Sequence, residues 1–582
     1  MLNRFSWIFS LVIVSLGALA LLASSAIWLR FYTEAPVRDL AYILPLVQSG
    51  VTDGWQSISF GEWVSPFAHA HRIAITRLLM LMDYTFLGGK NYFLYLSLWI
   101  SLLVVFLVYL KAARSLLDHQ NSAQLFIAGV VLLFLCSPSQ YMGLLDPQNA
   151  SWYVAMAASA ASFWLVLAQG AKVTTQRALL ACLCASIAAF SNFSGVLTCL
   201  LLPLMTVFQR PGRWPLGLMI VYTTLFVALY LQGIGSDGSE LAASPAFLEA
   251  LKVAIANNPD VLTQTTSFTL YWNRLILIVS RTCLQLGATI GFQHPFVAPA
   301  AVLSSAVYIG YHWLKLGLCA YFKRELPSGA IQLFLAMATL CLAISCAIWF
   351  GRVAFIAPEA NRYQTISMHY WLNVSCLLFF HLRQTYKRQH YIITMTLTAS
   401  IPLILLWGSS DYTRKELNWF HTQSSFLQVV GELNPGLIQK SFSMILQKEW
   451  YGNVSDHRLF LEKYRFQRPY NERGSMANAE YQGSLCEGAQ LSTKKSRWPG
   501  VQSVSIAFDS RVNPFLTKMY LQGADTNHAR LYARVPPTLG LTSILQGEYQ
   551  WNGFYKGDTR AATTLKLAFT SATGAIIQCE LQ

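Results

Sequence analysis

Four groups of polar residues lie just outside long apolar segments of this chain, and each offers a distinct chemistry. The first is Asp39, in the run Val37-Arg38-Asp39-Leu40. A carboxylate at this position is suited to deprotonate a hydroxyl that attacks a lipid-linked donor, as a general base does. Asp39 also fits an ordinary role as the partner of Arg38 or at the start of a helix. Position alone favours the ordinary role.

The second group is basic and follows in the same polar stretch. His69 and His71 are two residues apart, a spacing that does not share one helix face, and no cysteine or acidic cluster lies nearby, so a zinc site is not supported. Arg72 and Arg77 complete the group. A guanidinium is permanently charged and binds phosphate through two parallel hydrogen bonds, so Arg72 is a candidate contact for a lipid phosphate. Snorkelling to ordinary headgroups is an equal alternative.

The third group is Arg352 with Asn361-Arg362-Tyr363, in a short segment between two apolar runs. Two arginines and a tyrosine in so short a loop indicate anion binding by Arg352, Arg362 and Tyr363. Ion pairing with Glu359 is the alternative, at even odds.

The fourth group is the run Asp146-Pro147-Gln148-Asn149. The carboxylate of Asp146 and the amide of Gln148 are suited to bind sugar hydroxyls. A proline turn that begins the next helix requires the same residue types.

Several familiar motifs are absent from the sequence. It contains no Walker A sequence, no GxGxxG after a strand, no GxSxG and no HExxH. Nucleotide-driven pumping and the common hydrolase and zinc-protease mechanisms therefore lack support. We expect no cofactor, and a divalent metal stays open.

The composition places these residues in a membrane protein. Of 582 residues, 54% are hydrophobic and 12% are charged, whereas soluble domains carry about 25% charged residues. The formal net charge of +15 comes from Lys and Arg placed between apolar runs, which favours the bilayer and not nucleic acid as the partner.

The apolar runs predict about eleven membrane helices within residues 1–408. These are 7–29, 91–110, 124–138, 151–168, 178–191, 196–208, 215–235, 296–316, 328–350, 367–382 and 391–408. Two places are ambiguous. The segments between 178 and 208 are short and form either two spans or a re-entrant pair. The segment 271–292 carries Arg274 and Arg281, which favour an interfacial helix over a span.

Loop charge predicts the orientation, because short cytoplasmic loops carry an excess of Lys and Arg. The expected cytoplasmic residues are Arg4, Lys111, Arg114, Lys172, Arg177, Arg210, Arg213, Lys315, Lys323, Arg324, Arg383, Lys387 and Arg388. We therefore expect a multi-pass protein of the bacterial inner membrane with a cytoplasmic N-terminus. The first outer loop, 30–90, contains an expected interfacial helix over 71–84.

The tail after residue 408 is expected to be periplasmic and to have two parts. Residues 409–498 show helical periodicity and predict a helical connector. From 499 to 582, short alternating strands separated by Gly, Asp, Asn and Pro predict a small antiparallel β-sandwich, so the tail is α+β. In an oxidising compartment, Cys486 and Cys579 are candidates for a disulfide.

This layout resembles the GT-C superfamily of membrane glycosyltransferases: a first helix, a large outer loop with an early acid, many further spans and an outer C-terminal domain. The residues that carry the resemblance are Arg38-Asp39, 71–79, 146–149 and 351–363. The likeness covers residues 1–408. It is greatest to bacterial members without assigned substrates and looser to glucosyltransferases that modify O-antigen.

The resemblance implies inverting transfer of a hexosyl or pentosyl group from a polyprenyl-phosphate donor to a glycan or lipid acceptor. Asp39 would be the base, and Arg72, Arg352 and Arg362 would contact the donor phosphate. The sequence departs from relatives that carry an Asp-Glu pair after the first helix, since Leu40 follows Asp39. Asp53 and Glu62 are the alternative bases.

Two other readings stay open at the level of sequence. A flippase or transporter of lipid-linked saccharide would use the same arginines without a base. Such a protein is expected to show internal repeats and charges at the membrane midplane, which the sequence lacks. A non-catalytic envelope assembly protein would need neither Asp39 nor Arg362.

Overall fold

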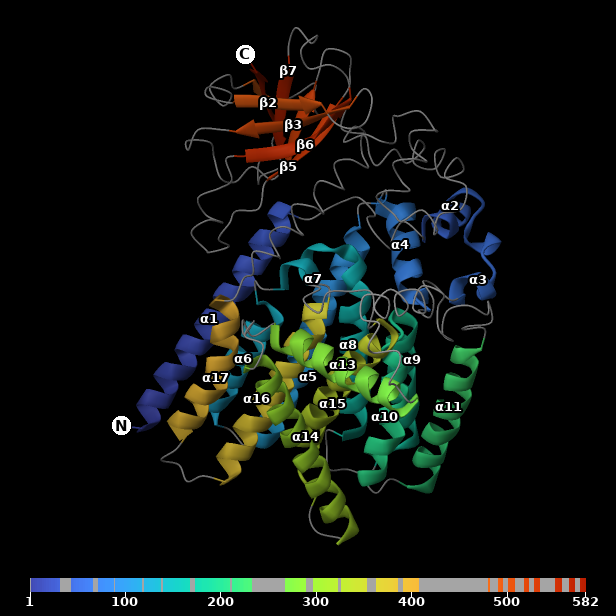
Figure 1. Ribbon diagram of the computed structural model, residues 1–582, viewed down its shortest axis with the longest axis vertical. Helices are drawn as coiled ribbons and strands as arrows, with labels where there is room; N and C mark the ends of the chain where they lie inside the picture. Colours follow the sequence, from blue (N-terminus) through green and yellow to red (C-terminus); the bar gives the residue numbers. More distant parts are fainter. Residues whose placement is uncertain are drawn as a thin grey trace.

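The computed structural model shows a mainly helical protein with a small sheet near the C-terminus (Figure 1). The structure describes residues 2–31, 43–65, 72–87, 89, 91–117, 120–137, 140–167, 173–209, 212–232, 267–288, 297–322, 326–352, 363–385, 391–407, 480–481, 490–495, 501–507, 518–522, 528–533, 550–556, 565–570 and 576–581.

The long helices form a bundle, and short helices lie at one end of it (Figure 1). The long helices are α1 (Leu2–Phe31), α5 (Tyr92–Leu117), α6 (Asn121–Leu135), α8 (Ala150–Leu167), α9 (Thr175–Ser191), α10 (Gly195–Phe208), α11 (Arg213–Leu231), α13 (Ser267–Ala288), α14 (Val297–Tyr321), α15 (Gly329–Arg352), α16 (Gln364–Thr385) and α17 (Tyr391–Trp407). The short ones are α2 (Leu44–Thr52), η2 (Trp55–Ser57), α3 (Phe60–Val64), α4 (Ala74–Leu87), α7 (Tyr141–Leu145) and η4 (Pro147–Asn149).

Five helices of the described residues are long and apolar enough to cross a membrane. They are Arg4–Ala26, Tyr92–Leu117, Pro147–Leu167, Arg213–Leu231 and Gly329–Trp349. Four shorter apolar helices accompany them: Asn121–Leu135, Thr175–Ser191, Gly195–Phe208 and Ile392–Leu403. Several long apolar helices of this kind indicate a multi-pass membrane protein. A helix lies at each of the eleven predicted spans.

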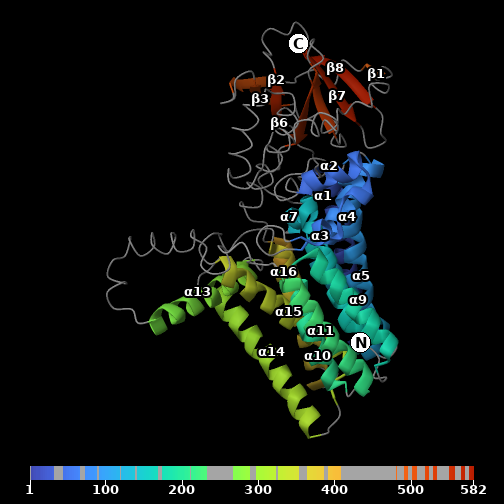
Figure 2. The same cartoon turned by 90° about the vertical axis from the view of Figure 1, so that its right-hand side faces the viewer.

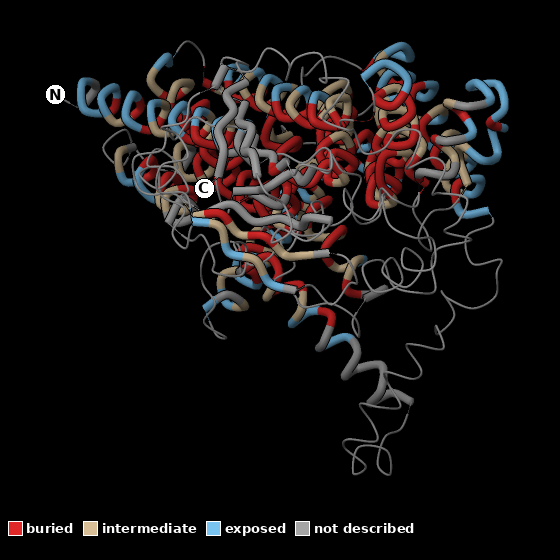
Figure 3. The backbone as a smooth tube through the Cα atoms, turned by 90° about the horizontal axis from the view of Figure 1, so that it is seen from above, coloured by how far each residue is buried: buried red, intermediate tan, exposed pale blue. Residues whose placement is uncertain are grey.

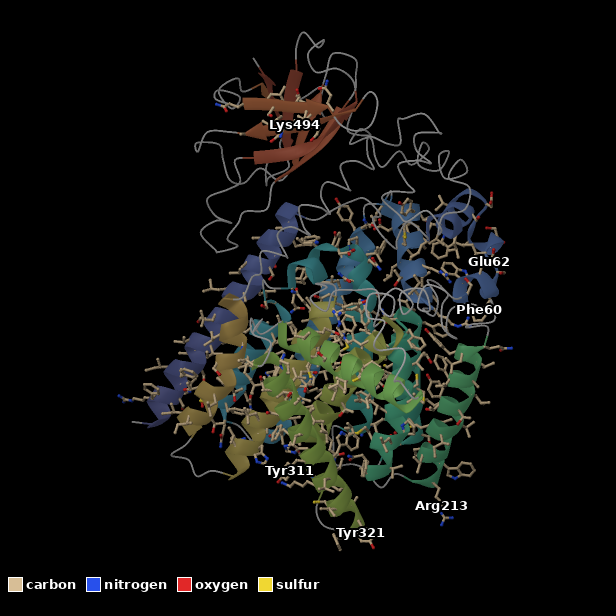
Figure 4. All side chains as sticks on the ribbon, in the orientation of Figure 1. Phe60, Glu62, Arg213, Tyr311, Tyr321 and Lys494 are labelled. Carbon is tan, nitrogen blue, oxygen red and sulfur yellow. The ribbon has the colours of Figure 1, made fainter. Side chains whose placement is uncertain are left out.

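The bundle helices alternate in direction, so basic helix ends gather at the end opposite the sheet. Figure 4 labels Arg213 and Tyr321 at that end, and Glu62 near the other. Described basic residues in the corresponding helix turns are Arg4, Lys111, Arg114, Arg177, Lys315 and Arg383. This grouping agrees with the one expected from loop charge.

The ambiguous pair α9 and α10 extends between the two ends of the bundle. Phe193, in the turn that joins them, packs on Tyr230 with ring centroids 6.1 Å apart, so the turn lies level with the last turn of α11. At the other end, Gln209 donates to Gln332 near the start of α15, at 2.5 Å. The pair therefore behaves as two antiparallel helices of full depth.

The second ambiguous segment, α13, lies obliquely to the neighbouring helices and projects from the bundle at its N-terminal end (Figure 2). Leu275, Ile276 and Val279 are exposed, whereas Ile278 and Leu286 are buried. This one-sided pattern is typical of an interfacial helix. The predicted interfacial helix 71–84 is α4, which instead continues roughly along the direction of the bundle helices on top of α5 and α9 (Figure 1).

Close approach of backbones joins α1 to α6. A Cβ atom added at Gly129 would lie 2.6 Å from the backbone nitrogen of Val14, and one added at Gly17 would lie 2.9 Å from the carbonyl oxygen of Gly129. Without a strong hydrophobic force between helices in lipid, such close backbone contact is a main source of helix association.

The core of the bundle joins early and late helices. Figure 3 shows buried stretches gathered in the interior and exposed ones at the perimeter. The hydroxyl of Tyr109 in α5 donates to Oδ1 of Asn373 in α16 at 2.8 Å. Near the basic end, Arg383 donates to Oε1 of Gln120 at 2.8 Å and to the carbonyl of Leu116 at 3.3 Å. The last turn of α5 is thereby capped by a cation from α16.

The sheet contains eight strands among the described residues, in the order β1-β8-β7-β4-β5-β6-β3-β2. They are β1 (Glu480–Tyr481), β2 (Gln490–Lys495), β3 (Val501–Ala507), β4 (Lys518–Gln522), β5 (His528–Ala533), β6 (Gln550–Lys556), β7 (Leu565–Thr570) and β8 (Ile576–Leu581). All neighbours are antiparallel except β1 and β8. β5 pairs with β4 through its first half and with β6 at Tyr532 and Ala533, so it joins two groups of strands.

The sheet begins before residue 499, where the sequence predicted it to start. β1 and β2 lie within the stretch predicted as a helical connector. β2 reads QLSTKK, with Gln490, Ser492 and Lys494 exposed and Leu491 and Thr493 partly buried. A polar edge strand of this kind has too weak a hydrophobic alternation to be recognised. The rest of the connector, up to 479, and Cys486 lie outside the described residues, so the pairing with Cys579 of β8 stays a prediction.

Candidate functional site at the sheet-side end of the bundle

The short helices α2, α3 and α4 form the end of the bundle that faces the sheet (Figure 1). α3 begins with a capping box: Oγ of Ser59 accepts from the backbone N–H of Glu62 at 3.2 Å, and Oε2 of Glu62 accepts from the backbone N–H of Ser59 at 2.7 Å. This reciprocal pair satisfies donors that the first turn leaves without partners. It lets a helix of five residues persist.

Arg72 is buried and holds the C-terminal ends of two helices together. Its Nε donates to the carbonyl of Tyr230 at 2.8 Å, and its two terminal nitrogens donate to the carbonyls of Val64 and Gln232. Its backbone N–H donates to the hydroxyl of Tyr230 at 3.1 Å, and its guanidinium lies 5.6 Å from the centre of that ring. The last carbonyls of α3 and α11 therefore share one cation, which opposes the negative end of each helix dipole.

Arg77, on the first turns of α4, completes the cap of α3. Its Nη1 lies 2.9 Å from the carbonyl of Glu62, 2.8 Å from that of Trp63 and 2.9 Å from that of Ser65. The two arginines thus contact every carbonyl from residue 62 to 65. We call Arg72, Arg77 and these carbonyls the arginine clamp.

The arginine clamp carries positive charge that the described residues do not neutralise. Within the described residues, neither guanidinium has a carboxylate partner. The carboxylate that α3 carries, that of Glu62, is exposed and bonded to Ser59 instead. Burial and the nearby charge of Arg72 lower the pKa of Arg77 to about 10. Arg77 is therefore cationic at neutral pH.

Asp83 is fully buried and fixes the start of α5. Its two carboxylate oxygens accept from the backbone N–H groups of Asn91 at 2.6 Å and Phe93 at 2.8 Å. The turn that brings them there uses Gly89 and Asn91, both with positive φ. A Cβ at Gly89 would lie 2.7 Å from the ring of Tyr84. A buried carboxylate on backbone donors at a helix start is a stabilising cap.

Asp146 is also buried, and it begins η4. Its Oδ1 accepts from the backbone N–H of Gln148 at 3.0 Å, and its carbonyl accepts from that of Asn149. The turn thus uses Asp146 in the capping role that the sequence left as one of two alternatives. Among the predicted sugar contacts, Gln148 is partly buried in the same turn.

Tyr363 lies close to the Asp146 turn, and the ring of Trp152 connects the two. Trp152, six residues after Asp146, packs edge-on against Tyr363 with centroids 6.1 Å apart. Trp349, one turn before Arg352 in α15, packs on the other side of Tyr363 at 6.4 Å. The structure therefore brings Tyr363 and the Asp146 turn together near the end of α15. Of Arg352, the structure describes the backbone at the end of α15.

Hydrogen bonds from Trp349 and Trp371 connect this region to α13. Nε1 of Trp349 donates to Oε1 of Gln285 at 2.7 Å, and Nε1 of Trp371 donates to the carbonyl of Leu286 at 2.7 Å. Ser367 adds a bond to the carbonyl of Gln285 at 3.2 Å. The C-terminal turn of the oblique helix is thus fixed to α15 and α16. The sequence analysis did not single out Gln285. The only feature of the sequence that could have indicated its role is an amide near the end of an amphipathic segment.

The remaining predicted site residues differ in what the structure says of them. Asp39 and Arg362 lie outside the described residues, so their convergence with Arg72 on one site stays a prediction. Asp53 is exposed at the C-cap of α2. Hydrogen bonds from Ser59 lower the pKa of Glu62, which makes it a weaker base. In the described part of the chain, no group of three or more His, Cys, Asp or Glu residues is placed to hold a metal ion.

Comparison with known proteins gives no match: no protein-family model, no curated protein and no solved structure is similar to this chain.

Proposed function

We propose that this chain is a membrane glycosyltransferase of the GT-C type. It moves a sugar from a polyprenyl-phosphate donor to a glycan or lipid acceptor of the cell envelope, with inversion at the anomeric carbon. In this proposal about eleven helices cross the bacterial inner membrane. The end with α2, α3 and α4 faces the periplasm, as does a C-terminal β-sandwich.

The observation that carries the proposal is where buried charge lies. Among the described residues, the buried Arg, Lys, Asp and Glu side chains are Arg72, Arg77, Asp83 and Asp146. All four lie in the short helices and turns at one end, and none lies at the middle of a candidate span. Charged groups are costly near hydrocarbon unless paired or functional, so their collection at one membrane surface supports chemistry there.

The arginine clamp supports a phosphate donor. It holds two buried guanidinium groups at the end of α3, and one of them, that of Arg72, also bonds to the carbonyls where the candidate span α11 ends. Guanidinium groups are the preferred partners of phosphate oxygens. In the proposal, donor phosphate is drawn to the clamp and to Arg352 and Arg362, while Asp39 removes the proton of the acceptor hydroxyl.

The Asp146 turn and Tyr363 supply the floor of the proposed site. Asp146 shapes the turn as a cap and Tyr363 is buried against Trp152 and Trp349, so the partly buried Gln148 is the better candidate for contact with sugar hydroxyls. Glu62 is disfavoured as the base because its carboxylate is occupied by Ser59. Asp39 is the first choice and Asp53 the second.

The distribution of charge favours the enzyme over a transporter in this proposal. A transporter of lipid-linked saccharide is expected to bind its cargo near the midplane, with polar or broken helices there. The described spans place no buried Arg, Lys, Asp or Glu at that depth, although α16 buries the polar side chains of His369 and Asn373, and α10 and α17 contain Pro203 and Pro402. The position of the charged groups supports a site at the surface.

The experiment is transfer of labelled sugar in membranes that contain the protein and a polyprenyl-phosphate sugar donor. Asp39→Asn is expected to abolish transfer while expression and insertion stay normal. Asp53→Asn tests the second candidate base, an exposed carboxylate of the same segment, and is expected to keep transfer. Full transfer by Asp39→Asn together with loss in Asp53→Asn would reassign the base.

A second arm tests the donor and the class of protein. Membranes from cells that cannot make polyprenyl-phosphate sugars are expected to show no labelling until donor is added back. Movement of donor across the bilayer without any glycosidic product would replace the enzyme by a flippase. Unchanged labelling without donor would reject the proposed donor class.

A further inference from the structure

Phe60, the first residue of α3, is a strongly exposed aromatic residue. Its side chain is 78% exposed, although α3 is otherwise held tightly by its capping box and by the arginine clamp. In a multi-pass membrane protein, an exposed aromatic side chain near the end of a lipid-facing helix is suited to the membrane interface, where aromatic residues are enriched. Figure 4 labels Phe60 on the side of α3 nearer α11, and Glu62 on the side away from it.

The clamp fixes α3 against the end of a candidate span. One guanidinium, that of Arg72, bonds to the carbonyl of Val64 at the end of α3 and to that of Gln232 just after α11. These two helix ends therefore lie within the reach of a single planar group. Phe60 is four residues from Val64, which is about 6 Å along a helix axis. It thus lies close to the level at which α11 ends.

The surface of α11 that leads to this point is lipid-facing. α11 is the least buried of the five candidate spans. Val221, Leu225 and Leu229 are exposed at intervals of four residues, so they line one face that hydrocarbon must cover. Leu231, the last residue of the helix, is exposed as well, but it lies two residues after Leu229 and therefore on another face. The lipid-facing side of α11 thus reaches Leu229, within one turn of the helix end that Arg72 joins to α3.

Charge at the same level agrees with a membrane surface. The two clamp arginines lie directly behind α3 without a carboxylate partner among the described residues. Positive charge just beyond the hydrocarbon is complementary to lipid phosphate. An aromatic ring on the hydrocarbon side and guanidinium groups on the headgroup side form the arrangement that the interface of a bilayer favours.

We infer that α3 is an anchor in the outer lipid leaflet, with Phe60 inserted among the acyl chains beside α11 and the arginine clamp holding the helix at headgroup depth. The partner is the lipid bilayer itself. This inference does not rest on the proposed transferase activity. It assigns to the outer loop a fixed depth in the membrane.

The test places an environment-sensitive fluorescent amino acid at position 60 by codon suppression. The protein is reconstituted in vesicles of phosphatidylethanolamine and phosphatidylglycerol, with or without lipids that carry a spin-label quencher near the headgroup end of an acyl chain. A matched probe at Gln56 reports an exposed position four residues earlier, outside α3. Exposed positions tolerate the probe, and size-exclusion chromatography verifies folding of both proteins.

The expected result is blue-shifted emission at position 60 that the quenching lipid removes for the most part, with little effect at position 56. Water-like emission without quenching at position 60 would overturn the anchor. Blue-shifted emission that lipid does not quench would also overturn it, because protein would then cover Phe60. Arg77→Gln is expected to reduce quenching at position 60, and an unchanged signal would remove the clamp from the inference.

Discussion

The backbone N–H of Arg72 donates to the hydroxyl of Tyr230, while the Arg72 side chain donates back to the Tyr230 carbonyl at 2.8 Å. This two-way contact joins residues 158 positions apart in the chain. It connects the segment between α1 and α5 to the end of α11. The hydroxyl of Tyr230 also donates to the carbonyl of Ala189 at 3.0 Å, so α9 joins the same junction.

Tyr230→Phe is expected to destabilise the protein by about 1–3 kcal/mol, because the buried N–H of Arg72 loses its acceptor. Unfolding in detergent, followed with denaturant, measures the change. Tyr321→Phe is the control, since Tyr321 is 80% exposed at the opposite end. Equal stability of the two variants would show that the junction contributes nothing.

Gly129→Ala is expected to lower stability by about 1–3 kcal/mol, because overpacking forces α1 away from α6. The added Cβ would meet the backbone of Val14, which cannot rotate aside. Gly310→Ala in α14 is the matched change, because nothing lies within 4 Å of a Cβ there. That variant is expected to gain about 0.5–1 kcal/mol, since Ala is the better helix residue. Thermal unfolding in detergent compares them.

Gln285→Leu is expected to cost about 1–3 kcal/mol, because the indole N–H of the fully buried Trp349 is left without its acceptor. A double-mutant cycle with Trp349→Phe isolates the bond, and the double variant is expected to lose less than the sum of the single losses. Hydrogen exchange in the last turns of α15 gives a local reading. Strict additivity would contradict the contact.

Acidification is expected to weaken the start of α3 through Glu62. Its pKa in the folded chain is lowered below the ordinary value of 4.5 by hydrogen bonds from the side chain and backbone of Ser59. The stabilisation is therefore complete above pH 4.5 and is lost as the pH falls through the lower, folded value. Amide protection of residues 60–63, corrected for intrinsic exchange rates, measures this. In Glu62→Gln, which keeps an acceptor but does not titrate, protection is expected to stay constant with pH.

Hydropathy predicted the positions of the bundle helices well, because the length of an apolar run is a local property. The predicted span 91–110 corresponds to α5, which continues to Leu117. The extension carries Lys111 and Arg114, whose charge ended the apolar run although the backbone stays helical. Long basic side chains at a helix end reach toward the headgroups, so hydropathy sets the boundary too early.

The segment between α1 and α5 was predicted less well for a physical reason. α2 and α3 are too short for periodicity to identify, and α3 depends on the clamp for its last carbonyls. The residue types at Arg72 and Asp146 were recognised as informative. Their partners are set by tertiary contacts, such as that of Arg72 with Gln232, 160 residues away. A spacing pattern contains no information about such pairs.

The contacts of α16 with α5 have a consequence for biosynthesis. Tyr109 meets Asn373 across 264 residues, and Gln120 meets Arg383 across 263. At about 5–20 residues per second, the ribosome needs roughly 15 to 50 seconds to make the intervening chain. For that time α5 carries the hydroxyl of Tyr109 in lipid without its final acceptor. Because α16 is made so late, the contact between α5 and α16 closes this part of the core only after most of the other bundle helices have been synthesised.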